Sequence, residues 1–167
     1  MKDTAHLAQV NIARLKAPLE DPLLAGFVAR LDEINALADR SPGFVWRLQT
    51  SAGNATYLRP YADERILFNL SVWRALEDLR AYVYRSAHVE VMRLRQEWFE
   101  RFEGAYVALW WVPAGHVPSV DEAKQRLAHL EAKGPTPFAF TFKVPFPCDQ
   151  ARLDATDWSA FEPCRAT

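Results

Sequence analysis

The sequence predicts an α+β fold, a ferredoxin-like βαββαβ sandwich with an added C-terminal helix and strand, two copies of which form a dimeric α/β barrel. First, stretches with an apolar residue at every second position alternate with stretches of helical periodicity. Second, the order of these stretches matches the split βαβ arrangement. Third, a sheet covered by helices on one side leaves an apolar face bare, and a second copy is its simplest cover.

Length and composition indicate a single domain. The chain has 167 residues, of which half are hydrophobic and a quarter are charged, and this length allows a substantial core. We expect one domain over residues 1–145, followed by an irregular tail over residues 146–167. Cys148 and Cys164 lie near the C-terminus without nearby histidines, so we interpret them as reduced thiols rather than zinc ligands.

Charge and hydropathy argue against two classes of partner, nucleic acids and membranes. The formal net charge is −1, and basic residues are scattered among acidic ones, which lacks the footprint of a nucleic-acid-binding protein. The N-terminus has no apolar signal segment, and no apolar run approaches the length of a membrane span. We therefore expect a cytoplasmic protein that binds neither nucleic acid nor a membrane.

The first strand and helix cover residues 6–40. The stretch HLAQVNIARL alternates, so that Gln9 and Asn11 fall on one face and aliphatic residues on the other. Asp21 followed by Pro22 predicts a helix start, and the helical pattern continues to about residue 40. Asn35 lies within its apolar stripe, either as a satisfied core amide or as a ligand contact.

The next two strands are SPGFVWRLQ, which carries Arg47, and RILFNLSVW at residues 65–73. In the latter, one face is wholly apolar and the other mixes Asn69, Ser71 and Trp73 with a leucine. We expect the apolar face to pack on the helices, and the mixed face to line the cavity of the dimer.

A helix over residues 75–85 precedes a second one that starts near His88 and continues past residue 99. A helical projection places His88 and Arg95 on the side of the apolar residues, opposite a ladder of exposed charges. Two interpretations remain open: a core histidine with an arginine stem that reaches water, or two residues that face a ligand.

The last elements are the strand AYVALWWVP, a helix and a final strand. Ser119 and Glu122 form a capping box, Gly134 ends the helix, and PTPFAFTFKV reads as the final strand. If the fourth strand follows the same register, Tyr106 and Trp110 also face the cavity. His116 lies in a turn, where an exposed histidine and a functional one are both reasonable.

The expected site is thus an aromatic-lined pocket with a few hydrogen-bonding groups, as is usual for small molecules. His88 and Arg95 are the candidate catalytic residues. The candidate substrate-binding residues are Gln9, Asn11, Asn35, Arg47, Asn69, Ser71, Trp73, Tyr106, Trp110 and His116. No metal-binding residue is expected.

Several separated blocks resemble a bacterial family known as domain of unknown function 3291. They include LAQVNIARLKAPLEDP, SPGFVWRLQ, LSVW, YVYRSAH, MRLRQEWF, ALWWVPAGHVP and GPTPFAFTF, in order from about residue 6 to residue 142. The resemblance implies membership of the dimeric α/β-barrel superfamily, whose branches include cofactor-free monooxygenases and haem proteins. None of these activities follows from the fold alone.

Three functions are compatible with this pattern. The first is an enzyme that acts on a partly aromatic metabolite without a tightly bound cofactor, with His88 moving a proton and Arg95 or Arg47 stabilising negative charge. The second is a haem protein in which His88 is the axial ligand. The third is a non-catalytic, ligand-binding homodimer. The chain carries no Gly-rich phosphate loop, GxSxG or HExxH motif.

Overall fold

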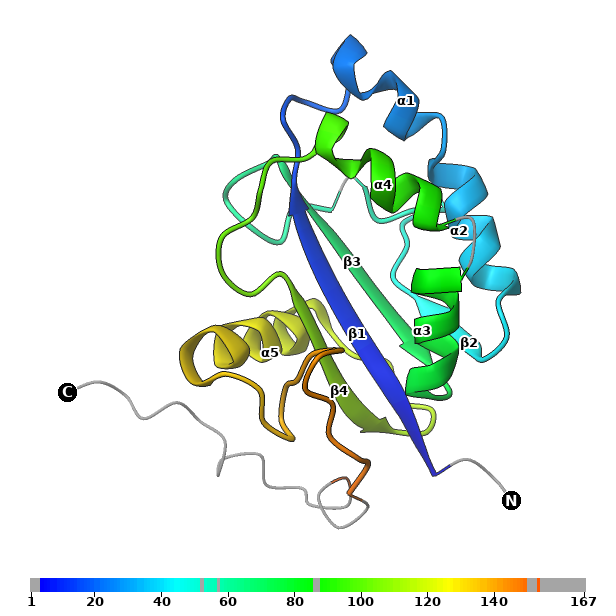
Figure 1. Ribbon diagram of the computed structural model, residues 1–167, viewed down its shortest axis with the longest axis vertical. Helices are drawn as coiled ribbons and strands as arrows, with labels where there is room; N and C mark the ends of the chain where they lie inside the picture. Colours follow the sequence, from blue (N-terminus) through cyan, green and yellow to red (C-terminus); the bar gives the residue numbers. More distant parts are fainter. Residues whose placement is uncertain (1–3, 52, 57, 86–87, 150–152, 154–167) are drawn as a thin grey trace, which may run out of the picture.

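A computed structural model describes residues 4–51, 53–56, 58–85, 88–149 and 153. It is an α+β structure with one four-stranded antiparallel sheet, in which the strands lie in the order β2-β3-β1-β4 (Figure 1). The strands are β1 (Ala5–Arg14), β2 (Phe44–Arg47), β3 (Ile66–Trp73) and β4 (Val107–Pro113). All four coincide with stretches in which the sequence alternates.

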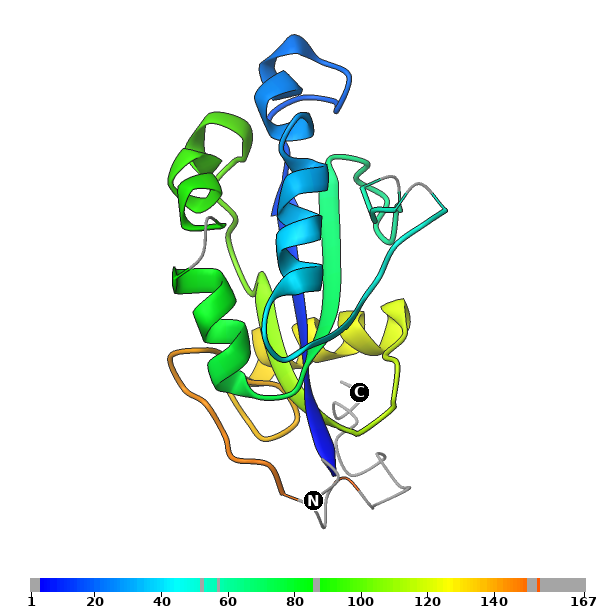
Figure 2. The same cartoon turned by 90° about the vertical axis from the view of Figure 1, so that its right-hand side faces the viewer.

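The helices lie on both sides of this sheet. A layer on one side contains the 3₁₀ turn η1 and helices α1 to α4, and α5 packs on the other side (Figures 1 and 2). Their bounds are η1 (Pro22–Leu24), α1 (Ala25–Val28), α2 (Leu31–Arg40), α3 (Leu76–Arg85), α4 (His88–Trp98) and α5 (Val120–Lys133). None of the helices in the described ranges combines the length and apolarity needed to cross a bilayer.

The apolar face of the sheet packs on a helix, as expected, but the mixed face is covered by helices of the same chain as well. The wholly apolar face, with Val10, Phe68 and Leu70, is buried against Ala123 and Leu127 of α5. The mixed face, with Gln9, Asn11 and Ser71 on it, looks toward α2, α3 and α4 of the same chain. Alternation was right about which residues share a face, but it carries no information about which helices cover that face.

The first predicted helix is divided in two. Asp21 caps its start as expected, with its Oδ1 accepting the Leu23 amide at 2.9 Å, but the helix breaks between α1 and α2. The two parts pack differently: Phe27 of α1 lies against Trp98 and Phe99, whereas α2 lies over the sheet. A single straight helix could not both pack Phe27 against Trp98 and lay the α2 segment over the sheet.

The expected final strand does not form in the described residues. Only isolated bridges occur after α5, one of them between Leu109 and Phe140, whose amides and carbonyls exchange two hydrogen bonds of 2.9 Å. The segment still covers the sheet, since Phe140 is fully buried. The helix before it is as predicted: Ser119 Oγ accepts the Glu122 amide at 3.0 Å, and Gly134 ends α5 at φ 72°.

The second helix of the pair is shorter than its periodicity suggests. It ends at Trp98, so Phe102 lies beyond it and packs toward the core under α5 rather than along the helix. Leu15 and Phe99 form an isolated bridge at this point, and the backbone there bonds to the end of β1. Pairing with β1 therefore replaces the last helical turn.

Candidate functional site

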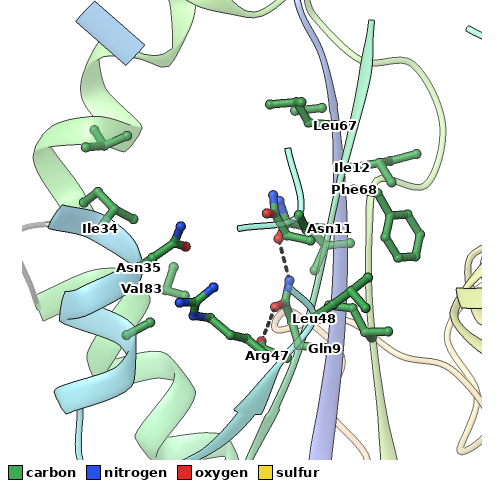
Figure 3. Close-up of a pocket in the computed structure, with 18 of the residues that line it drawn as sticks. Gln9, Asn11, Ile12, Ile34, Asn35, Arg47, Leu48, Leu67, Phe68 and Val83 are labelled. Carbon is green, nitrogen blue, oxygen red and sulfur yellow. Dashed lines mark hydrogen bonds between the residues drawn. The ribbon is translucent and has the colours of Figure 1, made fainter. Parts of the chain in front are cut away.

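A pocket of about 240 Å³ lies between the mixed face of the sheet and the layer of helices α1 to α4 (Figure 3). We call it the sheet–helix pocket. Figure 3 shows Ile34 and Asn35 of α2 on one side of it, and Gln9, Asn11 and Leu67 of the strands on the other. This pocket lies within one chain, whereas the sequence analysis expected a cavity between the sheets of two chains.

The floor of the pocket is a chain of hydrogen bonds along the sheet. The Trp73 indole N–H donates to Ser71 Oγ at 3.0 Å, and Ser71 Oγ donates to Gln9 Oε1 at 2.9 Å. Gln9 Nε2 then donates to Asn11 Oδ1 at 2.9 Å (Figure 3). Four residues that the sequence placed on one face are therefore joined in one chain of hydrogen bonds, which runs from the Trp73 donor to the Asn11 acceptor.

Asn69 and Asn35 complete the polar lining. Asn69 is the partner of Asn11 in the β1–β3 register and is exposed at the mouth of the pocket. Asn35 enters the pocket from α2, facing the sheet (Figure 3). Among the residues with described side chains, neither amide has a hydrogen-bond partner. Both groups are thus available to a ligand.

Arg47 lines the pocket but is already engaged. Its Nε and Nη2 donate to the two carboxylate oxygens of Asp39 at 2.7 and 3.2 Å, and its Nη1 donates to the Gly53 carbonyl at 2.8 Å. Its side chain is only 13% exposed. The guanidinium therefore joins α2 to the loop after β2, and its charge is neutralised by Asp39.

Arg95 lines the pocket from α4 and has no such partner. Its Cζ lies 5.8 Å from the centroid of the Tyr106 ring, and it forms no hydrogen bond or ion pair with any described side chain. Tyr106 immediately precedes β4 and also lines the pocket. The two residues thus form a cation and an aromatic ring in contact on the pocket wall.

Tyr82 of α3 is a pocket residue that the sequence reading missed. Its ring stacks on Trp73, with 5.1 Å between the centroids, and burial raises the pKa of its hydroxyl to about 12. The only available signal was its place in an apolar helical stripe, which is equally typical of a core residue.

His88 is the first residue of α4, and its side chain lies outside the described part of the structure. The residues three, four and seven positions later, Val91, Met92 and Arg95, line the pocket. Cys164 also lies outside the described residues, and Cys148 is exposed.

Trp110 and His116 lie away from the sheet–helix pocket, and the prediction that Trp110 lines it is wrong. Trp110 is fully buried in the core under α5, and its indole N–H donates to Glu122 Oε1 at 2.9 Å. His116 Nε2 lies 2.8 Å from Glu122 Oε2. Both residues thus meet at Glu122 on α5, Trp110 from the face of β4 that packs on that helix and His116 from the segment that follows β4.

The described lining offers amides, hydroxyls and guanidinium groups rather than carboxylates or imidazoles. The described lining residues include no aspartate, glutamate, histidine, lysine or cysteine. Nor does any group of three such acids, histidines or cysteines gather anywhere in the described ranges. The walls are formed by apolar residues, including Phe27, Leu31, Val91 and Phe99. This arrangement, with apolar walls and a few oriented polar groups, is typical of small-molecule sites.

Comparison with known proteins finds one family. The family described as a domain of unknown function, DUF3291, matches residues 6–156. No curated protein sequence matches the chain. The crystal structure of a protein of unknown function from Nitrosomonas europaea is similar over 70% of this chain and 98% of that chain, at 12% identity and a TM-score of 0.44. So remote a similarity carries no argument.

Proposed function

The chain belongs to the DUF3291 family, whose description assigns no activity, and we propose that it binds a small, partly aromatic metabolite in the sheet–helix pocket. One observation carries the proposal: amide and guanidinium N–H groups that have no acceptor among the described side chains lie in a pocket with largely apolar walls. Polar groups beside a pocket are commonly satisfied by a ligand or by water. A volume of about 240 Å³ suits a compact ligand.

Filling the pocket tests this proposal. Ala13 lines it from β1, so an Ala13→Phe substitution places a ring in the space that the ligand would occupy. Ala132 is exposed on α5, and Ala132→Phe is the matched control. We expect a set of small aromatic compounds to bind the wild type and the control, as measured by ligand-detected NMR, and not to bind Ala13→Phe. Equal binding by all three proteins would contradict the proposal.

A second candidate function is catalysis without an organic cofactor, similar to that of the monooxygenases in the dimeric α/β-barrel superfamily. The observation that favours it is the position of His88, because the residues three, four and seven positions later on α4 line the pocket. A histidine there would supply the proton-transfer group that the described lining lacks. Arg95 would then stabilise negative charge that develops on a substrate oxygen.

The described pocket offers little to hold haem. Arg47, one of the two lining cations that could bind propionates, is already bound to Asp39. No step of the proposed function therefore depends on haem. An absorption spectrum after haem supplementation tests that alternative, since bound haem gives an intense Soret band.

The ferredoxin-like arrangement and the homodimer are also proposals. The strand order β2-β3-β1-β4 with antiparallel neighbours supports the split βαβ arrangement. The original reason for a dimer, a bare apolar face, is weakened because α5 covers much of that face. What still supports it is the resemblance to a dimeric superfamily, and light scattering at micromolar concentration tests it.

A further inference from the structure

We propose that the ligand of the sheet–helix pocket carries a carboxylate, held by Arg95 together with the amide groups of Asn11 and Asn69. This inference rests on the proposed function and specifies the class of its ligand. It follows from the charges of the pocket, from the direction of its hydrogen bonds and from the register of the strands.

The charges of the pocket do not balance. Its described lining contains two cations, Arg47 and Arg95, and no carboxylate. Asp39, outside the lining, neutralises Arg47 through two hydrogen bonds. Arg95 is a half-buried residue with no carboxylate partner in the described part of the chain. The pocket therefore carries one positive charge that a bound anion would compensate.

The hydrogen bonds along the floor of the pocket leave the N–H groups of the Asn11 amide free to donate to a ligand. Because Gln9 Nε2 donates to Asn11 Oδ1, the acceptor side of the Asn11 amide is occupied, and its Nδ2 group points elsewhere. Nδ2 has no acceptor among the described side chains. The chain from Trp73 through Ser71 and Gln9 thereby fixes the orientation of Asn11 and leaves N–H groups for a ligand oxygen.

The strand register brings these groups to one region of the pocket. Asn11 is the partner of Asn69 on one side and of Val107 on the other. Tyr106 precedes Val107 in the chain, and Arg95 lies over its ring. Asn69, Asn11 and Val107 are therefore neighbours across the sheet, and Arg95 of α4 reaches the same end of this row through its contact with Tyr106. A carboxylate is the ligand group that fits both kinds of donor, because it accepts two parallel hydrogen bonds from a guanidinium and further bonds from amide N–H groups.

The apolar wall on the helical side of the pocket indicates what the part of the ligand beyond its carboxylate should be. Phe27, Leu31, Ile34 and Phe99 form an apolar surface on the helical side of the pocket. A ligand that places its carboxylate at Arg95 would bury an aromatic or branched apolar body against this surface. The predicted class is therefore a compact aromatic monocarboxylate.

The test compares carboxylates with their neutral amides on the full-length protein. The probes are benzoate, phenylacetate, cinnamate and indole-3-acetate, each paired with its primary amide, and dissociation constants come from NMR titration. We expect at least one carboxylate to bind about tenfold or more tightly than its amide, the effect typical of a charge-assisted hydrogen bond. Arg95→Gln should reduce this ratio to near one, and Arg95→Lys should retain most of it.

Arg93→Gln is the matched control, because Arg93 is an exposed arginine on the same helix and does not line the pocket. It should leave the ratio unchanged. Equal affinities for carboxylate and amide in the wild type would overturn the inference and leave the proposed function standing. A preference that persists in Arg95→Gln would overturn the assignment to Arg95. Failure of both series to bind would overturn the proposed function itself.

Discussion

Arg47 and Asp39 form a two-point ion pair, with the Arg47 Nε and Nη2 atoms 2.7 and 3.2 Å from the Asp39 carboxylate oxygens. The pair joins the end of β2 to α2 across the sheet–helix pocket. It also decides the charge of the pocket, because it leaves Arg95 as the one uncompensated cation among the described lining residues.

Removing the Asp39 charge should have two effects. Asp39→Asn leaves Arg47, a largely buried cation, without its counter-charge, so we expect the free energy of unfolding to fall by about 1–3 kcal/mol. The same change adds a second free cation to the pocket, so phenylacetate should bind more tightly. Urea denaturation and NMR titration measure the two effects. Glu33→Gln, at an exposed position of the same helix, is the control.

The raised pKa of Tyr82 predicts a loss of stability at high pH. Its hydroxyl has a pKa of about 12 in the folded chain, against 10.0 ordinarily, so the folded state retains the proton more strongly than the unfolded state does. The contribution is therefore constant below pH 10, and stability falls as the pH rises from 10 to 12. We expect a loss of about 1 kcal/mol at pH 11 from this group. Urea denaturation should show a shallower decline for Tyr82→Phe, and an identical decline would contradict the assignment.

The charged residues on the outer face of α4 and just after it should contribute little. Glu90, Arg93, Glu97 and Arg101 are all exposed. Replacing them together with a different charge pattern should cost about 1 kcal/mol or less, because exposed pairs are weak. A loss several times larger in urea denaturation would mean that this face of α4 packs against something.

His88 should matter for turnover rather than for folding, if the protein is an enzyme. We expect His88→Ala to keep its melting temperature within a few degrees and to bind the same aromatic probes, while losing turnover of any substrate identified. His116→Ala is the control, since His116 contacts Glu122 away from the pocket. Unchanged turnover in His88→Ala would eliminate His88 as the proton carrier.

Local patterns in the sequence predict much of the fold and part of the site. Alternation placed Gln9, Asn11 and Ser71 on one face of the sheet, because side chains of a strand point to opposite sides in turn. The capping residues Asp21 and Ser119 marked their helix starts for an equally local reason.

What the sequence could not predict depends on residues far apart in the chain. Trp110 was expected on the face of Gln9 and Asn11 but pairs with Ala8 on the other face, because alternation within one strand does not fix its register against the next strand. The Phe138–Phe142 stretch alternates like a strand but forms only isolated bridges. The ion pair between Arg47 and Asp39 could not be predicted either, because the two residues belong to different elements and no local sequence pattern relates them.

The position of a bound ligand is the most direct test of the account, and two tryptophans report on it. The Trp73 indole N–H lies in the floor of the pocket, bonded to Ser71, whereas the Trp110 indole N–H lies on the other face, bonded to Glu122. Their signals in a ¹H–¹⁵N NMR spectrum can be assigned with Trp73→Phe and Trp110→Phe. On titration with each of the four carboxylates we predict that at least one produces a saturable shift of the Trp73 signal and that none shifts the Trp110 signal. A saturable shift of Trp110 with Trp73 unmoved, or no shift of either signal, would contradict the account.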